Sequence, residues 1–403
     1  MIIRRPIVLR AQRGYTLLPL LAFVAVAAAS LVYVWAAPRD DSAARDQRTA
    51  AALALARDAL IGRAAADDTR PGSLPCPDVD NDGVADGAFG NCTSYLGRLP
   101  WRTLGLPDMR DGSGERLWYA LSSAYRDNAG GGPLNSDTPG AYTVRDGTGT
   151  LLASDAPALV IAPGPALGSQ SREAGNQALA AMYLDGENAN ADSSYVAAPL
   201  GSAFNDRVMI VAREDLFRPV VARVAKEVQA ALERYRATNQ YYPPANPYSA
   251  GGPSYFCDPA TLRGRIPLTI RGGSPLTGCT AHAPWNAELP TWFFDNNWHL
   301  VTHYAVSSGC ADPSPTSQGP CMANGGAGAL AIGGVSSAVR VLVIVSGPAR
   351  GGQGRPCASV ADCLEDAANS DGDTSYVKPS QGPAANDRLA ATCGTASPCA
   401  AMP

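Results

Sequence analysis

The segment from Asp78 to Asp86 holds the residues whose types and spacing most favour chemistry. It reads Asp-Val-Asp-Asn-Asp-Gly-Val-Ala-Asp, so carboxylates alternate with other residues and a glycine stands sixth. A loop of this kind wraps a hard cation that prefers oxygen ligands, because the glycine permits the sharp turn. We therefore predict a calcium site. Its ligands would be the side chains of Asp78, Asp80, Asp82 and Asp86 and the main-chain carbonyl of Val84.

This acidic loop (residues 78–86) departs from the EF-hand. Its twelfth position is Phe89 rather than a bidentate Glu, and no helix is expected after it. It is closer to the shortened calcium loops of extracellular modules. A solvated acidic turn is the alternative, although its aspartates would repel one another without a cation. Further acidic loops at residues 185–188 and 369–373 are better explained as polar surface turns, because their spacing is irregular.

Ten cysteines, all C-terminal to an apolar N-terminal stretch, indicate an oxidising compartment. Ten thiols allow on the order of a thousand pairings, and pairing of nearest neighbours is the simplest. A zinc site is not expected, because the sequence contains no Cys-x-x-Cys. The predicted disulfides, of which the first brackets the acidic loop, are Cys76–Cys92, Cys257–Cys279, Cys310–Cys321, Cys357–Cys363 and Cys393–Cys399.

Signals for catalysis are weak elsewhere in the chain. His299 and His303 stand four residues apart, but His303 falls in a predicted strand, where that spacing separates side chains by about 13 Å. Neither a Gly-x-Ser-x-Gly elbow nor a phosphate-binding glycine loop occurs. A net charge of −4 argues against a nucleic-acid partner. We expect a protein that is not an enzyme.

A calcium loop and disulfides require export from the cytoplasm, and the N-terminal residues carry a signal for it. Four arginines precede an uncharged apolar run over residues 17–37, long enough at about 1.5 Å per residue to span a bilayer core of about 30 Å. Basic residues before such a run keep the N-terminus in the cytoplasm, so we expect a single-pass protein with its bulk exported. A signal peptide cleaved near residue 29, a twin-arginine signal and an uncleaved anchor are alternatives, as is the leader described next.

The residues Arg13-Gly14-Tyr15-Thr16-Leu17 and the apolar run after them resemble the leader of type IV prepilins and type II secretion pseudopilins. The resemblance implies that prepilin peptidase cleaves between Gly14 and Tyr15 at the inner membrane and that Tyr15 is then methylated. Most members of the family carry Glu at the fifth mature position, where this chain has Pro19. That departure is typical of the large tip subunit of type II secretion pseudopili.

The exported part contains a tandem repeat. Helical periodicity over residues 40–66 and 219–238 is followed each time by the same landmarks in the same order. Examples are Leu-Gly-Arg-Leu-Pro at 96–100 against Arg-Gly-Arg-Ile-Pro at 263–267, and Asn-Asp-Arg at 205–207 and again at 386–388. Strands are predicted at 118–122, 158–161 and 208–212 in the first copy, and at 303–307 and 339–345 in the second.

These observations predict an α+β fold in which an N-terminal transmembrane helix continues into a helix packed on an antiparallel sheet, followed by a second helix-plus-sheet head. The expected parts are a leader (1–14), a transmembrane helix (15–37) and two pilin-like heads (38–215 and 216–403). The resemblance implies a minor pilin or pseudopilin at the tip of a filament, with other pilin-like subunits as partners. The alternative is a membrane-anchored periplasmic or surface adhesin, with the heads as binding modules.

Overall fold

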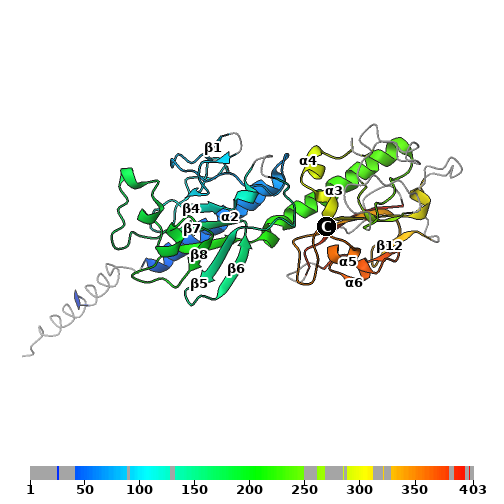
Figure 1. Ribbon diagram of the computed structural model, residues 1–403. Coiled ribbons are helices and arrows are strands. Elements are labelled where there is room, and N and C mark those ends of the chain that lie inside the picture. Colours follow the sequence, from blue (N-terminus) through cyan, green and yellow to red (C-terminus); the bar gives the residue numbers. More distant parts are fainter. Residues whose placement is uncertain are drawn as a thin grey trace, which may run out of the picture. The chain divides into compact units, whose positions relative to one another are not determined.

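The computed structural model describes residues 25–26, 41–88, 91–127, 132–248, 261–267, 285, 288–311, 321, 328–380, 385–394 and 399 (Figure 1). The predicted processing residues Gly14 and Tyr15 and the predicted pair Cys257–Cys279 lie outside this part of the chain. Residues 1–47 and 48–403 form two separate compact units. The account below concerns the second unit, which contains most of helix α2 (Ser42–Ala66) and everything after it.

The first module runs from α2 to β9 and is built around a four-stranded antiparallel sheet in the order β3-β4-β7-β9. One stripe of α2, including Ala56 and Leu60, shares a core with alternate residues of β4 and β7, such as Tyr119 and Val160. Small alanines in this stripe allow the helix to approach the sheet closely. The strands are β3 (Leu96–Arg98), β4 (Trp118–Leu121), β7 (Ala158–Ala162) and β9 (Arg207–Val211).

A smaller sheet completes the first module, in the order β6-β5-β8. Its strands are β5 (Tyr142–Asp146), β6 (Leu151–Ala156) and β8 (Ser194–Ala197), and β5 pairs with β8 in parallel. A separate core fills the opposite face of the main sheet, where Trp118 and Ile161 meet Tyr142 and Tyr195. A short hairpin, β1 (Gly87–Ala88) and β2 (Asn91–Cys92), follows the acidic loop.

The second module runs from α3 (Arg213–Asn239) to β15 and has a single six-stranded sheet. Strand β13 lies at its centre: one of its edges pairs with β11 and, nearer its start, with β12, and the other edge pairs with β15. Short helices α4 (Thr291–Asp295), α5 (Val360–Cys363) and α6 (Ala367–Ser370) lie in its connections. The strands are β10 (Arg263–Arg265), β11 (Thr302–Val306), β12 (Leu330–Ile332), β13 (Ser336–Val345), β14 (Ser375–Tyr376) and β15 (Arg388–Cys393).

One proline explains why the two modules differ in sheet number. Pro157 separates β6 from β7, whereas β13 runs without a break through the matching position, Arg340. The positions match because Ser122 donates its N–H to the Pro157 carbonyl at 2.8 Å, and Ser307 donates to the Arg340 carbonyl at 2.9 Å. Proline has no N–H to donate to a ladder, so it ends one strand and lets the next begin in another sheet.

The two modules share one hydrophobic core. Phe217, near the start of α3, packs against Tyr125 of the first module and Trp298 of the second, with ring centroids 6.1 Å apart in each pair. Helix α3 begins at Arg213, earlier than the predicted residue 219, and the expected boundary between residues 215 and 216 falls inside its first turn. Pro219 lies within the helix, where burial of Leu216 and Phe217 compensates for the hydrogen bond that proline cannot donate.

The predicted fold class is wrong, because the structure is mixed α/β. Two strand pairs are parallel, β5 with β8 and β12 with β14, so the sheets are not purely antiparallel. Strand periodicity reveals which residues are buried but not the direction of the partner, and long crossovers make the parallel pairings possible. The predicted transmembrane helix is not seen: among the described residues no helix is long and apolar enough to cross a membrane, and all but two residues of segment 15–37 lie outside them.

Candidate functional site

Asp78 organises the acidic loop through hydrogen bonds to the backbone. Its side chain is completely buried, and its Oδ1 accepts the N–H of Asn81 at 2.6 Å and that of Asp82 at 3.2 Å. Its Oδ2 accepts the N–H of Gly83 at 2.7 Å. The sequence favours this turn, because Asn81 and Gly83 take the positive φ angles of 68° and 92° that asparagine and glycine tolerate best.

Three of the predicted ligands lie close together. Carboxylate oxygens of Asp78, Asp80 and Asp86 are all within 4.8 Å of one another. Asp86 also accepts the N–H of Val79 at 2.5 Å, which ties the end of the loop to its start. Asp82 is not part of this group, and its Oδ1 instead accepts the N–H of Val84 at 2.7 Å. A carboxylate cluster of this kind suits a hard divalent cation.

One disulfide closes the loop at its base, and one close backbone contact holds it on the main sheet. Cys76 and Cys92 are bonded with their Cα atoms 5.2 Å apart, and they bracket the loop as predicted. Asp78 and Arg98 exchange both backbone hydrogen bonds, at 2.9 and 2.6 Å. Gly97 allows this approach, since a Cβ there would lie 2.7 Å from the Asp78 carbonyl oxygen.

The charge balance of the loop favours a bound cation. Burial raises the pKa of Asp78 above its usual range, and the three backbone N–H groups that it accepts oppose this effect. The neighbouring negative charge of Asp80 raises that pKa further. Arg116 is the nearby counter-charge: it donates to the carbonyl oxygen of Asn81 at 2.5 Å and to its Oδ1 at 2.9 Å. Arg116 also pairs with Asp108 at 2.8 Å, so its charge is shared.

The second module holds the same backbone bridge without the carboxylate. Asn246 and Arg265 exchange backbone hydrogen bonds at 3.0 and 2.7 Å, as Asp78 and Arg98 do. Gly264 takes the place of Gly97, and a Cβ on it would collide with the Asn246 carbonyl oxygen. The residue matching Asp78 is therefore an amide, Asn246.

Four of the five predicted disulfides are confirmed. Besides Cys76–Cys92, the structure contains the nearest-neighbour pairs Cys310–Cys321, Cys357–Cys363 and Cys393–Cys399. These last three pairs belong to the second module, and five of their six cysteines, all but Cys393, are buried. They close short loops in a region rich in glycine and proline, which limits the freedom of the unfolded chain.

Two buried aspartates at matching positions were not singled out from the sequence. Asp206 accepts the N–H of Asp185 at 2.8 Å, and Asp387 accepts that of Glu365 at 3.1 Å. Burial raises the pKa of each to about 7. The signal that could have found them is the repeated Asn-Asp-Arg, whose asparagines donate to the carbonyls of Pro165 and Pro348. Asp206 thus braces the loop at residues 185–188, which was expected to be a simple polar turn, whereas Asp387 holds Gly347 and Glu365, outside the expected turn at residues 369–373.

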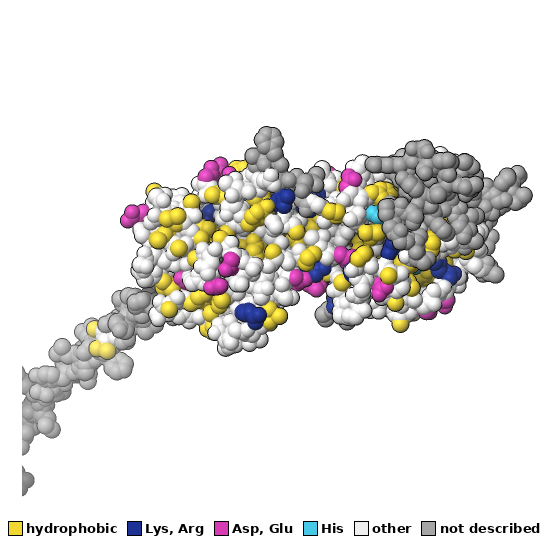
Figure 2. Space-filling view, in the orientation of Figure 1, with side chains coloured by type: hydrophobic (Ala, Val, Ile, Leu, Met, Phe, Trp, Pro, Cys, Tyr) yellow, Lys and Arg dark blue, Asp and Glu magenta, His cyan; other side chains and the backbone are white. Residues whose placement is uncertain are grey.

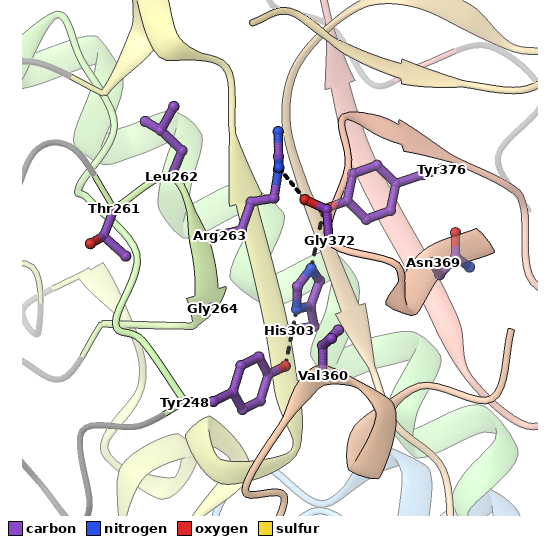
Figure 3. Close-up of a pocket in the computed structure, with 10 residues that line it drawn as sticks. All are labelled: Tyr248, Thr261, Leu262, Arg263, Gly264, His303, Val360, Asn369, Gly372 and Tyr376. Carbon is purple, nitrogen blue, oxygen red and sulfur yellow. Dashed lines mark hydrogen bonds between the residues drawn. The ribbon is translucent and has the colours of Figure 1, made fainter. Parts of the chain in front are cut away.

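A second concave feature lies in the second module, around His303 of β11 (Figure 3). The cavity has a volume of about 450 Å³. His303 is 2% exposed, and its ring nitrogens face two phenol oxygens, Tyr248 at 3.0 Å and Tyr376 at 3.3 Å. Burial lowers the pKa of His303 to about 3, so the imidazole is neutral at ordinary pH. His303 lies in a strand, as predicted.

The surface gives no further grouping of charge on the face that Figure 2 shows. Over the described residues of that face, basic side chains are scattered among acidic ones. The candidate sites are therefore the acidic loop of the first module and the cavity of the second. No family model matches this chain, and neither a curated protein nor a solved structure was found to match it.

Proposed function

We propose that this chain is a minor pilin or pseudopilin, a non-enzymatic structural subunit of a type IV pilus or a type II secretion filament. The observation that carries the proposal is the leader-like sequence Arg13-Gly14-Tyr15-Thr16-Leu17. A basic stretch ending in glycine, followed by an aromatic residue, threonine and a long apolar run, suits cleavage by prepilin peptidase. Cleavage after Gly14 leaves Tyr15 as the new N-terminus, which is methylated.

In this proposal the apolar residues 17–37 hold the chain at the inner membrane, with its bulk in the periplasm, until it joins other pilin-like subunits. Helix α2 supports a role in assembly, because only one stripe of it is buried. Leu55, on its other side, is 47% exposed, and Ala50 and Ala51 are exposed beside it. Apolar residues left open on a helix provide a surface for neighbouring subunits.

The position in the filament follows from Pro19. The family's usual Glu at this place is thought to pair with the N-terminus of the adjoining subunit, and proline cannot make that contact. A subunit at the tip needs no such partner on one side. Two modules that share a core also give the bulk expected of a terminal subunit. We therefore place this chain at the tip or at the start of assembly.

The acidic loop is proposed to bind calcium with Asp78, Asp80 and Asp86. These residues fit the ion, because their oxygens converge within 4.8 Å and the buried Asp78 gains from a compensating positive charge. The bound ion would supply cross-linking, since it joins the two ends of the loop. Together with the Cys76–Cys92 disulfide it would stiffen one edge of the first module.

The test is mass spectrometry of the N-terminus, on full-length protein extracted from membranes with and without prepilin peptidase. We expect a methylated Tyr15 that depends on the peptidase and is lost in Gly14→Val. Gly62→Ala is a matched control, because that glycine of α2 has open space around it. A start near Ser30 would contradict the proposal and indicate an ordinary exported protein. An intact Met1 in every sample would favour the anchored adhesin instead.

A further inference from the structure

Near the cavity around His303, the second module departs from the first at two positions. In the first module, Trp118 pairs with Arg98 on β3 and with Ile161 on β7. His303 occupies the same place in the second module, opposite Arg265 on β10 and Ile344 on β13. An indole is therefore replaced by the smaller imidazole at an identical point in the sheet.

The second departure removes an aromatic partner. In the first module the Arg98 guanidinium lies 4.2 Å from the ring centroid of Trp118 and 3.9 Å from that of Tyr183, which packs this space. Neither residue that matches Tyr183 in the second module is aromatic. Aligning Asn188 with Asn369, which bond both backbone groups of Val196 and Val377, matches Tyr183 with Leu364, and aligning the N–H groups that Asp206 and Asp387 accept matches it with Cys363. In the second module the matching arginine, Arg265, packs instead on Tyr248, with its guanidinium carbon 5.4 Å from the ring centroid, and a cavity of about 450 Å³ lies beside His303.

The polar groups in the cavity leave one phenol proton free. A neutral imidazole has one N–H donor and one acceptor nitrogen, so it accepts from one tyrosine and donates to the other. The tyrosine that donates to His303 uses its only proton, while the one that accepts keeps its proton for a third group. In either tautomer, Tyr248 or Tyr376 can therefore donate a hydrogen bond to a ligand.

Arg263 supplies the charge. It is the one charged side chain among the described residues that line the cavity, and its guanidinium donates to the Gly372 carbonyl (Figure 3). Its Nε is buried and has no hydrogen-bond partner in the described part of the chain. The other side chains that line the cavity are the rings of Tyr248, His303 and Tyr376, the aliphatic Val360, and the polar Thr261 and Asn369, with Leu262 beside them just before strand β10. Tyr248 and His303 lie parallel, with an interplanar angle of 10°.

We propose that this cavity binds an aromatic carboxylate, whose carboxylate meets Arg263 and the free phenol proton while its ring packs on the aromatic and aliphatic walls. A planar guanidinium is suited to a carboxylate, and the volume is that of an ordinary small-ligand site. The ligand is either a free acid or the C-terminal aromatic residue of a peptide. This binding does not depend on filament assembly.

Calorimetry and saturation-transfer NMR on the full-length chain test the proposal. The probes are N-acetyl-L-tyrosine, which mimics a chain end, 4-hydroxyphenylacetate as the free acid, and N-acetyl-L-tyrosinamide, which lacks the charge. We expect at least one of the two acids to bind with a dissociation constant on the order of 1 mM or lower. If N-acetyl-L-tyrosine binds, its amide should bind about 10- to 100-fold more weakly, because the amide lacks the negative charge. The tighter of the two acids identifies the source of the ligand.

Two variants locate the binding. Arg263→Gln removes the charge, and His303→Trp restores the residue that the first module carries at this position; each should weaken binding of the acid at least about tenfold. Arg145→Gln is the matched control, since Arg145 also lies on a strand and donates to a glycine carbonyl, at 3.0 Å. Unchanged binding in Arg263→Gln, equal affinity for the N-acetylated acid and its amide, or no binding of either acid at 10 mM would each overturn the proposal. If His303→Trp does not fold, the proposal is still tested by Arg263→Gln and by the comparison of N-acetyl-L-tyrosine with N-acetyl-L-tyrosinamide.

Discussion

Asp206 should make the protein less stable as the pH rises, because its carboxylate is buried without a counter-charge in contact. The residue is 1% exposed, and its Oδ2 accepts hydrogen bonds from the Asp185 N–H at 2.8 Å and from Asn188 Nδ2 at 2.9 Å. Its Oδ1 is buried and has no hydrogen-bond partner among the described residues. Burial raises the pKa of Asp206 to about 7, against 3.8 in the unfolded chain, and the two donors only partly offset this.

The size and sign of the effect follow from these two pKa values. Between pH 3.8 and 7 the folded protein holds a proton that the unfolded chain has released, so the free energy of unfolding falls as the pH rises through this range. A pKa difference of about 3 corresponds to about 4 kcal/mol over the whole range. Below pH 3.8 and above pH 7 the contribution of Asp206 is constant.

Asp206→Asn removes this dependence, since the amide keeps an acceptor for Asp185 and Asn188 but cannot ionise. We expect the variant to gain stability relative to the natural protein as the pH rises from 4 to 8, by up to about 4 kcal/mol. The unsatisfied amide N–H of the variant costs about 1–3 kcal/mol at every pH. It therefore lowers the variant's free energy of unfolding by the same amount throughout and leaves the pH dependence of that free energy unchanged. Urea denaturation of the full chain, with a calcium chelator present, measures the difference.

Asp387→Asn is the parallel case in the second module, because burial raises the pKa of Asp387 to about 7 as well. Asp58→Asn is the control, since the side chain of Asp58 is 62% exposed. If the difference in unfolding free energy between Asp206→Asn and the natural protein stays constant from pH 4 to 8, the reasoning from burial is refuted. A difference that shrinks with rising pH would refute its sign.

Three further predictions concern the acidic loop. Calcium at 2 mM should raise the free energy of unfolding by about 0.6–1.8 kcal/mol for a site of about 10⁻⁴–10⁻³ M, as read by calorimetry; an equal response in Asp78→Asn would contradict the site. Gly97→Ala should cost about 1–3 kcal/mol in urea unfolding, because its Cβ would meet the Asp78 carbonyl oxygen at 2.7 Å, and a cost no larger than that of Gly62→Ala would count against this contact. Replacing Cys76 and Cys92 by serine should cost about 3 kcal/mol and weaken calcium binding measured by titration; full retention of both properties would show that the bridge has no such role.

Local patterns in the sequence were enough for the features that depend on neighbouring residues. The cysteine spacings predicted all four disulfides that the structure describes, because short loops bring nearest neighbours together. Runs of valine, isoleucine and leucine predicted the central strands, such as β7 and β13, since burial favours β-branched residues there. Alternating carboxylates predicted a loop in which Asp78, Asp80 and Asp86 do converge.

Tertiary structure decided whatever depends on contacts between distant residues. Asp82 turns to the Val84 N–H because the backbone geometry of the loop directs it there. His303 meets Tyr248 and Tyr376 across 55 and 73 residues, a distance over which no periodicity carries information. Asp206 acquires its raised pKa only when the fold excludes water from it. Strand direction has the same origin, since residue patterns report which side chains are buried, while crossover paths determine which strands become neighbours.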